Sequence, residues 1–437
     1  MKLSKYAWIV QFENVYILYK CHHEIIVAID KALKDFLEQG DWSVLNEKHP
    51  TFFSYLLEKE FIIDEGVDES ENVVKEWESE DADNSVYNII INPTMDCNMR
   101  CWYCYEKHEK GSMMSEDMVS KVMEFTEHKI KNIDLKNLNI GFFGGEPLLF
   151  YKNIIHPMLE KIFMLCKQYN VKLAVGFTTN GYLLSEDILK ALKELDTTVP
   201  ISFQISLDGN ETLHNKTKFL SDKRGTYLQI LENIKTAVAL KFNVLLRCNC
   251  TLKNISSFID VAKDLSGIDN LVKQNVTIDL QHVWQDGKND TPEYREMLKT
   301  VRTAFNDYGF RVKADKAIAP ERCYADKDHG LVINYNGDIF SCTARTFKEA
   351  NREGIMTGGA EILWNDKRSQ RMAIKYGNNT CQACNIFPLC HGRCSQYKMD
   401  SGNVDCVCQY NEAQKRKLIE ERIQYIINDK KFNAYEN

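Results

Sequence analysis

Several features that assign a chain to a broad class are absent from this sequence of 437 residues. It has no run of about 18 apolar residues, so we expect no membrane-spanning helix and no membrane partner. Its first stretch, MKLSKYAWIVQFENVY, lacks the apolar core of about 7 to 15 residues that a signal peptide needs, and we therefore expect a cytoplasmic protein. The formal net charge of -7, without a long cluster of lysine and arginine, excludes a general attraction to nucleic acid. The unbiased composition excludes a disordered or fibrous chain.

Cysteine, by contrast, is abundant, with 15 residues. Disulfides are rare in the cytoplasm because thiols there are kept reduced. So many cysteines in that compartment indicate metal or redox chemistry. The chain is also too long for one small hydrophobic core, and its length predicts two or three domains.

The N-terminal part has the pattern of a small unit, which we predict to cover residues 1–70. Two short apolar runs predict a β-hairpin, and two stretches with helical spacing and a returning strand follow them. In order, these segments are 7–10 and 15–19 for the hairpin, 24–37 and 51–60 for the helices, and 61–63 for the last strand.

A strongly acidic stretch separates this unit from the rest of the chain. Residues 64–83 contain ten acidic side chains against one lysine. Such a stretch repels itself and buries little, which favours a linker over 71–85. A solvated surface helix around residues 73–77 is the alternative.

A regular alternation of strand-like and helical runs begins at residue 86. It predicts a parallel α/β barrel over 86–310, in which the functional site lies where the strands end. The six predicted strands are 86–91, 138–143, 172–178, 201–207, 243–249 and 276–283.

A cysteine motif follows the first of these strands, with Cys97, Cys101 and Cys104 within eight residues. Three thiolates on one loop can hold a [4Fe–4S] cluster and leave its fourth iron without a cysteine. A zinc knuckle is the alternative, but zinc prefers four nitrogen or sulfur ligands, and His108 is the nearest histidine. The spacing CxxxCxxC, with the aromatic Tyr103 before the last cysteine, resembles the radical S-adenosylmethionine (SAM) superfamily.

This resemblance implies that the open iron chelates the amino and carboxyl groups of S-adenosylmethionine. Electron transfer from the reduced cluster then yields methionine and a 5′-deoxyadenosyl radical. The next two strand ends fit such a site: Gly144 and Gly145 permit close backbone approach to a ligand, and Glu146 offers a carboxylate to the methionyl amine. Thr179 and Asn180 resemble the family's contact with the ribose and the methionine. A plain turn is the alternative for the Gly-Gly-Glu-Pro segment.

Strands four and five alternate polar and apolar residues. Ser206 and Asp208 fall on the lumen side, and a polar lumen is costly unless it holds a polar ligand. We therefore predict that both contact the cofactor, although an Asp-Gly pair also favours a turn by itself. On strand five, Arg247 is predicted to face the lumen, whereas Cys248 and Cys250 face the opposite way as buried core thiols.

One position departs from the family pattern. Where the family usually has an arginine that holds the cofactor carboxylate, this chain has Lys218. Lysine lacks the bidentate fork, so either the contact is looser or Arg224 supplies it. On strand six, Asp279 and Gln281 share a face and are candidates for substrate contact.

A second group of cysteines lies beyond the barrel, at Cys323, Cys342, Cys381, Cys384, Cys390 and Cys394, with a last one at Cys406 or Cys408. Its spacing closely resembles the SPASM extension, which binds two auxiliary iron–sulfur clusters. Gly337 lies between two apolar runs and predicts a hairpin that brings Cys323 and Cys342 together. The resemblance implies Cys323, Cys342 and Cys394 for the first auxiliary cluster, and Cys381, Cys384, Cys390 and Cys408 for the second.

Some of these ligands stay open. Cys406 competes with Cys408 for the last position, and the fourth iron of the first auxiliary cluster is either open to a substrate thiolate or held by Cys406 or by an oxygen or nitrogen ligand. Two structural zinc sites, with His391 available, are the alternative that the CxxC spacing alone permits.

Together these patterns predict an α/β protein built around a partial (β/α)6 radical SAM barrel. A winged-helix-like domain over 1–70 and the linker 71–85 precede the barrel over 86–310. A SPASM domain over 311–437, with a helical tail at 412–427, follows it.

The resemblance implies an enzyme with SAM and three [4Fe–4S] clusters, reduced by a donor such as flavodoxin or ferredoxin. The front domain resembles the winged-helix peptide-binding domain of many peptide-modifying radical enzymes, so we expect a ribosomally made precursor peptide as substrate and a thioether or carbon–carbon crosslink as product. An anaerobic sulfatase maturase, which oxidises Cys or Ser to formylglycine, shares the barrel and both auxiliary clusters and is the alternative. A non-catalytic iron–sulfur or zinc scaffold explains the cysteines but not the polar strand faces.

Overall fold

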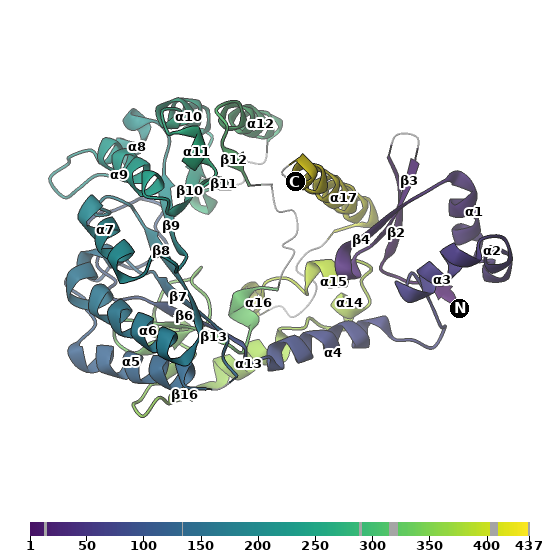
Figure 1. Ribbon diagram of the computed structural model, residues 1–437, viewed down its shortest axis with the longest axis horizontal. Coiled ribbons are helices and arrows are strands. Elements are labelled where there is room, and N and C mark those ends of the chain that lie inside the picture. The colour runs from purple at the N-terminus through teal and green to yellow at the C-terminus, as the bar shows by residue number, and fades with distance from the viewer. Residues whose placement is uncertain (13–14, 133, 288–290, 314–321, 403–409, 436–437) are drawn as a thin grey trace. The chain divides into compact units, whose positions relative to one another are not determined.

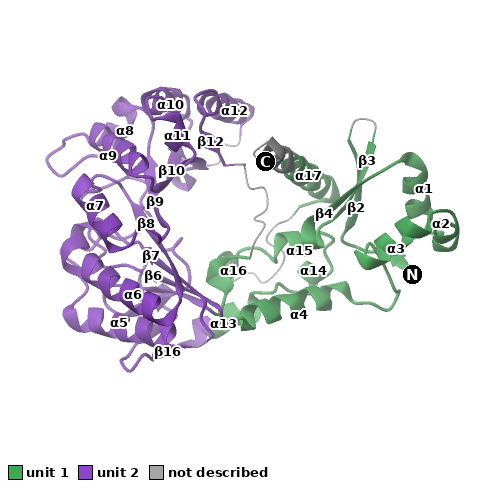
Figure 2. Ribbon diagram, viewed as in Figure 1, with its two compact units in different colours: residues 1–83, 314–328, 369–437 green, residues 84–313, 329–368 purple. Residues whose placement is uncertain are grey.

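The computed structural model describes residues 1–12, 15–132, 134–287, 291–313, 322–402 and 410–435, with side chains up to residue 427 (Figure 1). The chain forms two compact units (Figure 2). Unit 1 comprises 1–83, 314–328 and 369–437, and unit 2 comprises 84–313 and 329–368. Within the described ranges, no helix is both long enough and apolar enough to cross a membrane.

Unit 2 is built on a parallel sheet whose strands follow one another in chain order. Each strand pairs in parallel with the next one along the chain, and a helix covers each connection. The six strands are β6 (Val86–Ile91), β7 (Asn137–Phe142), β8 (Lys172–Thr179), β9 (Ile201–Leu207), β10 (Asn243–Cys250) and β11 (Val276–His282). The predicted partial (β/α)6 barrel is confirmed, and each strand begins and ends within one residue of its predicted limits.

Helices line the outer face of this sheet (Figure 1). Several begin at a side chain that caps the first turn, such as Ser115 before α5 and Ser185 before α7. The helices are α5 (Glu116–Ile130), α6 (His156–Tyr169), α7 (Glu186–Leu195), α8 (Glu211–Thr217), α9 (Tyr227–Ala239), α10 (Phe258–Leu265), α11 (Asn270–Lys273) and α12 (Pro292–Asp307).

The alternation along the strands decides what is buried beneath these helices. Phe203, Ile205 and Leu207 on β9 are fully buried in the core between sheet and helices. Cys248 and Cys250 on β10 belong to the same core, which confirms that they are core thiols. The polar residues of both strands therefore face the other side of the sheet.

The barrel sheet continues beyond its first strand into residues from much later in the chain. β13 (Gly330–Ile333) pairs in parallel with β6, and β14 (Asp338–Phe340), β15 (Gly354–Met356) and β16 (Ile362–Trp364) extend the sheet in antiparallel order. The predicted hairpin at Gly337 is confirmed; this glycine has a φ of 87°, which favours glycine. At the opposite edge, the short β12 (Arg311–Val312) pairs with β11.

The N-terminal part of unit 1 contains a three-stranded antiparallel sheet of β2 (Ala7–Phe12), β3 (Val15–Lys20) and β4 (Ile25–Ile29). The predicted hairpin is confirmed as β2 and β3. The prediction that 24–37 is all helix is wrong, because β4 occupies its first part. Four of its five residues are β-branched, and Asp30 caps a helix that begins only at residue 31.

Three helices and a small strand pair complete this region. Gly40 ends the first helix in a left-handed conformation, as its position predicts. The elements are α1 (Lys31–Gln39), α2 (Trp42–Lys48), α3 (Pro50–Glu58), and β1 (Lys2–Leu3) paired with β5 (Ile62–Ile63).

The acidic stretch forms helix α4 (Glu69–Ala82), capped by Asp68. The expectation that this stretch is a linker that buries little is wrong. Val73 and Trp77 lie one helical turn apart and are both buried in the core of unit 1. The alternative, a helix around these residues, describes the structure better, although one face of it is buried rather than solvated.

The core that holds α4 also takes in the C-terminal cysteine-rich segments. Trp77 packs against Phe387, and α17 adds Ile419 and Ile423. The remaining helices are α13 (Asp366–Ile374), α14 (Asn379–Gln382), α15 (Phe387–Cys390), α16 (Ser395–Ser401) and α17 (Glu412–Tyr435), the last of which confirms the predicted tail. The four predicted domain ranges stay a prediction, whereas compact unit 1 gathers segments from both ends of the chain.

Candidate functional site

The predicted site residues of the barrel come from one end of the sheet. The loop with Cys97, Cys101 and Cys104 follows β6, and Gly144 follows β7. Thr179 ends β8, Ser206, Asp208 and Arg247 lie on β9 and β10 or directly after them, and Lys218 follows α8. Because the six strands are parallel and adjacent, their carboxyl ends meet at one edge, which is where sites of this fold class form.

The cysteine loop is held by its own backbone and by an aspartate. The Asp96 carboxylate accepts hydrogen bonds from the backbone N–H groups of Cys97 (2.7 Å) and Gly111 (2.8 Å). The thiols of Cys97, Cys101 and Cys104 are all free and partly exposed. Each sulfur is therefore available as a ligand on a loop of fixed shape.

The spacing of these thiols bears on which metal centre fits. One zinc ion with bonds of about 2.3 Å needs sulfur atoms roughly 3.8 Å apart. Over the ranges that the structure describes, no three cysteine sulfurs lie within 4.8 Å of one another. As placed, the three sulfurs do not form the close group that one zinc ion needs, while Cys104 Sγ lies 3.5 Å from His108 Nε2. Three thiolates on one loop are a ligand set for a larger centre with several irons.

Burial controls the protonation of the three thiols. Burial raises the pKa of Cys97 and of Cys101, and it raises the pKa of Cys104 to about 11. The three thiols are therefore protonated at neutral pH in the protein alone. A bound metal centre reverses this, because its positive charge stabilises the thiolate that ligates it.

Gly144 and Gly145 lie against the cysteine loop itself. A Cβ atom on Gly144 would come within 2.4 Å of the Thr94 carbonyl oxygen, and one on Gly145 within 2.1 Å of the Asp96 carbonyl oxygen. The Gly145 N–H donates to that Thr94 oxygen (3.1 Å). The sequence predicts that these glycines let the backbone approach a ligand. In the structure, the atoms nearest to them are instead backbone atoms of the segment that leads into the cysteine loop. Their absent side chains let the end of β7 pack onto it.

Glu146 connects the ends of β7 and β8. It is fully buried and accepts hydrogen bonds from the Leu148 N–H (3.0 Å), the Thr179 hydroxyl (2.7 Å) and the Asn180 N–H (2.8 Å). Burial raises the pKa of Glu146, which these three donors partly oppose. Asn180 in turn donates through Nδ2 to the Asn98 side-chain oxygen (2.7 Å), so this network reaches the cysteine loop.

A second network joins the cysteine loop to β9 and β10 through Tyr103. Its hydroxyl donates to the Asp208 carboxylate (3.1 Å) and accepts from Asn249 Nδ2 (2.9 Å). Burial, with the Asp208 charge next in importance, raises the pKa of Tyr103 well above its usual value, so the phenol stays a donor. Arg247 donates to Asn249 through Nε (3.1 Å) and extends the network along β10.

Lys218 binds the end of β9 through Ser206 and pairs with the Asp208 carboxylate that follows this strand. Its ammonium group lies 2.7 Å from the Ser206 carbonyl oxygen, 2.5 Å from the Ser206 hydroxyl and 3.1 Å from the Asp208 carboxylate. Two of the N–H groups of this ammonium donate to Ser206, and its charge pairs with Asp208. Arg224, the alternative cation, is exposed and pairs with Asp222 (2.6 Å). Among the described residues, the side-chain hydrogen bonds of Arg247 and of Arg224 both use Nε, and Arg247 is the one of the two that lies on a barrel strand beside the Tyr103 network.

His214 supports this network, and sequence reasoning missed it. It is fully buried, accepts from the Asp208 N–H at Nδ1 (3.3 Å) and contacts the Thr226 hydroxyl at Nε2 (3.1 Å). Burial lowers the pKa of His214 well below its usual value, so the ring is neutral. Only its position four residues before Lys218 in a polar run could have suggested it.

The predicted substrate contacts Asp279 and Gln281 lie together on β11. Gln281 donates to the Asp279 carboxylate (2.8 Å), and Lys313 lies 3.5 Å from its other oxygen. Near this strand, the rings of Tyr105 and Trp284 stack with centroids 6.1 Å apart. Trp284 is largely exposed, which adds an aromatic surface to the polar strand ends.

The auxiliary cysteines divide between the units. Cys323, Cys381, Cys384, Cys390 and Cys394 lie in unit 1, Cys342 lies in unit 2, and Cys406 and Cys408 lie outside the described residues. In unit 1, Cys381, Cys384 and Cys390 flank the short helices α14 and α15. His391 packs edge-on against Trp77, and burial lowers its pKa to about 4. Both auxiliary ligand sets stay predictions.

Comparisons with known proteins agree with the barrel site. Residues 91–265 match the family model of the radical SAM superfamily. The cysteine-type anaerobic sulfatase-maturating enzyme of Clostridium novyi is 30% identical over 159 residues, which cover 34% of this chain and 39% of that protein. The radical SAM cyclopropyl synthase TigE of Paramaledivibacter caminithermalis is 26% identical over 258 residues, 50% of this chain and 53% of that one. The chain thus spans about half the length of these curated relatives or less.

Solved structures share the fold. The enzyme anSMEcpe with bound AdoMet and Cp18Cys peptide has a TM-score of 0.55 at 17% identity and covers 78% of this chain and 98% of its own. SuiB of Streptococcus suis has a TM-score of 0.51 at 15% identity and covers 94% and 100%; it has been solved bound to S-adenosylmethionine and bound to precursor peptide SuiA.

Proposed function

Because residues 91–265 form a radical SAM domain, we propose that the chain is an enzyme that removes a hydrogen atom from a ribosomally made precursor peptide and installs a thioether or carbon–carbon crosslink. The observation that carries this proposal is the loop of three thiols, braced by polar networks from four neighbouring strands, β7 to β10. When bound on Cys97, Cys101 and Cys104, a [4Fe–4S] cluster supplies an open iron for SAM and the electron that cleaves it to methionine and a 5′-deoxyadenosyl radical.

The chain's own residues orient this site. Asp208 and Asn249 fix the Tyr103 ring beside the cysteines, while Glu146 fixes the turn after β8. Lys218 neutralises the buried Asp208 charge, which would otherwise be costly. Arg247 lies on β10 beside the Tyr103 network and retains its terminal guanidinium donors, whereas Lys218 is engaged by Ser206 and Asp208 and Arg224 is exposed. We therefore assign to Arg247 the contact with the carboxylate of the cofactor or of the substrate.

Capture of the peptide is assigned to the N-terminal sheet. The sheet order β2-β3-β4 leaves two edges, and an extended peptide can add a strand at an open edge. On the outer side of β2, Arg416 donates to the Ile9 carbonyl oxygen (3.2 Å). The edge of β4 pairs with no strand among the described residues, so we propose β4 as the docking edge. The SuiB structure with a precursor peptide, which covers 94% of this chain, supports a peptide substrate.

Two auxiliary [4Fe–4S] clusters complete the proposal, on Cys323, Cys342 and Cys394 and on Cys381, Cys384, Cys390 and Cys408. An auxiliary cluster can accept the electron left on an oxidised product, and a flavodoxin or ferredoxin supplies the electron that starts each turnover.

A sulfatase-maturase reaction is the second candidate. Its support is the 30% identity to the Clostridium novyi enzyme over 159 residues. In that case a cysteine or serine of a protein substrate becomes formylglycine on the same site.

Anaerobic reconstitution with iron, sulfide, SAM and dithionite tests the radical chemistry. The wild-type chain is expected to release 5′-deoxyadenosine, and Cys101→Ala to release none. Cys248→Ala is the matched control because Cys248 is a core thiol away from the loop. Absence of 5′-deoxyadenosine from the iron-loaded wild type would contradict the proposal.

Mass spectrometry of a co-expressed peptide separates the two substrates. A crosslink removes two hydrogen atoms, keeps any cysteine sulfur and gives no aldehyde, whereas formylglycine reacts with hydrazides. Ala28→Lys adds a charge to the exposed edge strand β4 and is expected to weaken peptide binding. Asn46→Lys on α2 adds the same charge elsewhere and should leave binding unchanged; equal binding by all three proteins would argue against the β4 edge.

A further inference from the structure

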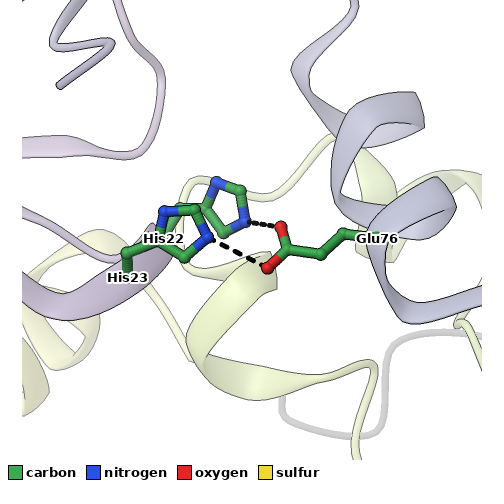
Figure 3. A group of neighbouring side chains, drawn as sticks. All are labelled: His22, His23 and Glu76. Atoms are coloured by element: carbon green, nitrogen blue, oxygen red, sulfur yellow. Dashed lines mark hydrogen bonds and ion pairs between the residues drawn. The ribbon is translucent and has the colours of Figure 1, made fainter. Parts of the chain in front are cut away.

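Three potential metal ligands meet in unit 1, far along the chain from every cysteine motif. His22 and His23 lie in the turn between β3 and β4, and Glu76 lies on α4 (Figure 3). The Nε2 atom of His22 is 2.6 Å from one Glu76 oxygen, and the Nε2 atom of His23 is 3.0 Å from the other. Both imidazoles thus point at one carboxylate.

The backbone is shaped to bring the two rings together. Consecutive residues of an extended chain point to opposite sides, so adjacent histidines do not normally share a target. Here His23 and Glu24 both have positive φ values, 65° and 50°, although neither is glycine. This conformation is unfavourable for such residues and turns the His23 ring onto that of His22, with centroids 3.9 Å apart and planes at 26°.

Neighbouring contacts hold the turn in this conformation. Arg422 on α17 pairs with the Glu24 carboxylate through two guanidinium nitrogens. Cys21, the residue before the pair, is buried in the core of unit 1. The arrangement is therefore fixed on both sides of the histidines.

The ligand atoms have the spacing and the chemistry of a metal site. The three contributing atoms lie within 4.8 Å of one another, and among the described residues no other histidine, cysteine or acidic side chains form such a group. Zinc bonds of about 2.0 to 2.2 Å to nitrogen and oxygen place two tetrahedral ligands roughly 3.3 Å apart. Glu76 is 39% exposed, so its carboxylate is free to withdraw by the fraction of an ångström that an ion requires.

We propose that His22, His23 and Glu76 bind one divalent transition-metal ion, for which zinc is the probe, with water in the remaining position. Two imidazoles and a carboxylate are a donor set that zinc and its neighbours in the series favour. The ion would fasten the β3–β4 turn to α4. Because Trp77, the next residue, packs against Phe387 beside the auxiliary cysteines, it would also tie the N-terminal sheet to the core of unit 1. This inference does not depend on radical chemistry.

Zinc binding to the full-length, iron-loaded protein tests the site. After anaerobic reconstitution has filled the cysteine sites with iron, equilibrium dialysis against zinc should give one bound zinc per chain in the wild type. His23→Asn, which retains a residue that tolerates a positive φ, and Glu76→Gln should each lose it, a larger effect than the roughly tenfold to hundredfold cost of removing a supporting contact. The controls His128→Asn and Glu78→Gln, both exposed on helices, should bind as the wild type does.

Zinc-edge X-ray absorption provides a readout that is independent of folding and of activity. The proposal expects nitrogen and oxygen neighbours only, at about 2.0 to 2.2 Å. It is overturned by sulfur neighbours, which would place zinc on cysteines, by zinc binding that survives both His23→Asn and Glu76→Gln, or by an iron-loaded wild type that binds no zinc. Unchanged circular dichroism and iron content in the two variants exclude loss of binding through unfolding.

Discussion

The two compact units are stabilised in different ways. Unit 2 contains one large apolar core between sheet and helices, to which every barrel strand contributes. Unit 1 divides its apolar residues between two smaller clusters, one around Leu18 and Phe61 and one around Trp77 and Phe387. Small cores supply little stability and usually need crosslinks or metals in addition.

Among the described residues, unit 1 also buries more ion pairs in its interior than unit 2 does. Asp81 on α4 lies 2.7 Å from Arg322, 2.7 Å from Lys375 and 2.7 Å from the Tyr376 hydroxyl. These partners lower the pKa of Asp81 against the opposing effect of burial. Arg371 is fully buried beside Asp326. The contrast indicates that unit 2 folds by apolar packing and presents chemistry at its strand ends, whereas unit 1 depends on specific polar contacts and, we propose, on metals.

The largest expected effect separates chemistry from stability. Cys101→Ala in unit 2 should abolish SAM cleavage but leave the barrel strands protected from hydrogen exchange, because the loop lies over a complete core. Cys384→Ala in unit 1 should instead increase exchange in α14, α15 and α4. Hydrogen-exchange mass spectrometry of both variants measures this difference, and equal loosening of the two units would remove the contrast.

The next largest effect concerns a buried charge. Asp81→Asn leaves Arg322 and Lys375 without their shared carboxylate, and breaking a buried ion pair costs about 3 to 5 kcal/mol. Urea unfolding followed by exchange in α4 should show this loss in unit 1 and little change in β6 to β11. Glu78→Gln, exposed on the same helix, is the control. Loss of stability confined to the barrel would contradict the assignment.

A smaller effect is expected inside the barrel. Ile205→Val removes one methylene from a fully buried position, which costs about 0.5 to 1.5 kcal/mol. The same urea experiment, read at β9, measures it. If Ile205→Val lowered the free energy of unfolding as much as Asp81→Asn does, the apolar core of unit 2 would be no more tolerant of substitution than the polar interior of unit 1.

The smallest effect belongs to the surface. Lys190 on α7 pairs with Glu186 (2.8 Å) one turn away, and both side chains are well exposed. Water and salt screen such a pair, so Lys190→Ala should leave the unfolding curve unchanged. A measurable shift of the unfolding midpoint would show that surface ion pairs contribute to the stability of unit 2.

The regular parts of the fold could be predicted because a local pattern controls them. Strands 86–91 and 201–207 match β6 and β9 at both ends, since alternating burial leaves a direct trace in the sequence. Residues 25–29 were mistaken for helix because a short run of isoleucine and valine satisfies both periodicities. The many acidic residues of α4 favour an exposed segment, so the sequence does not indicate that Val73 and Trp77 are buried. Their burial depends on segments some 300 residues later in the chain.

Sequence by itself determined the order of strands and helices, the cysteine motifs and the polar character of the strand ends, because spacing and alternation are local properties. Only the tertiary structure decided that Lys218 is engaged by Ser206 and Asp208, that His214 supports Asp208, and that His22 and His23 face Glu76. Those contacts join residues on different elements, and whether a polar side chain binds a ligand or another part of the chain depends on which partners folding brings within hydrogen-bond distance.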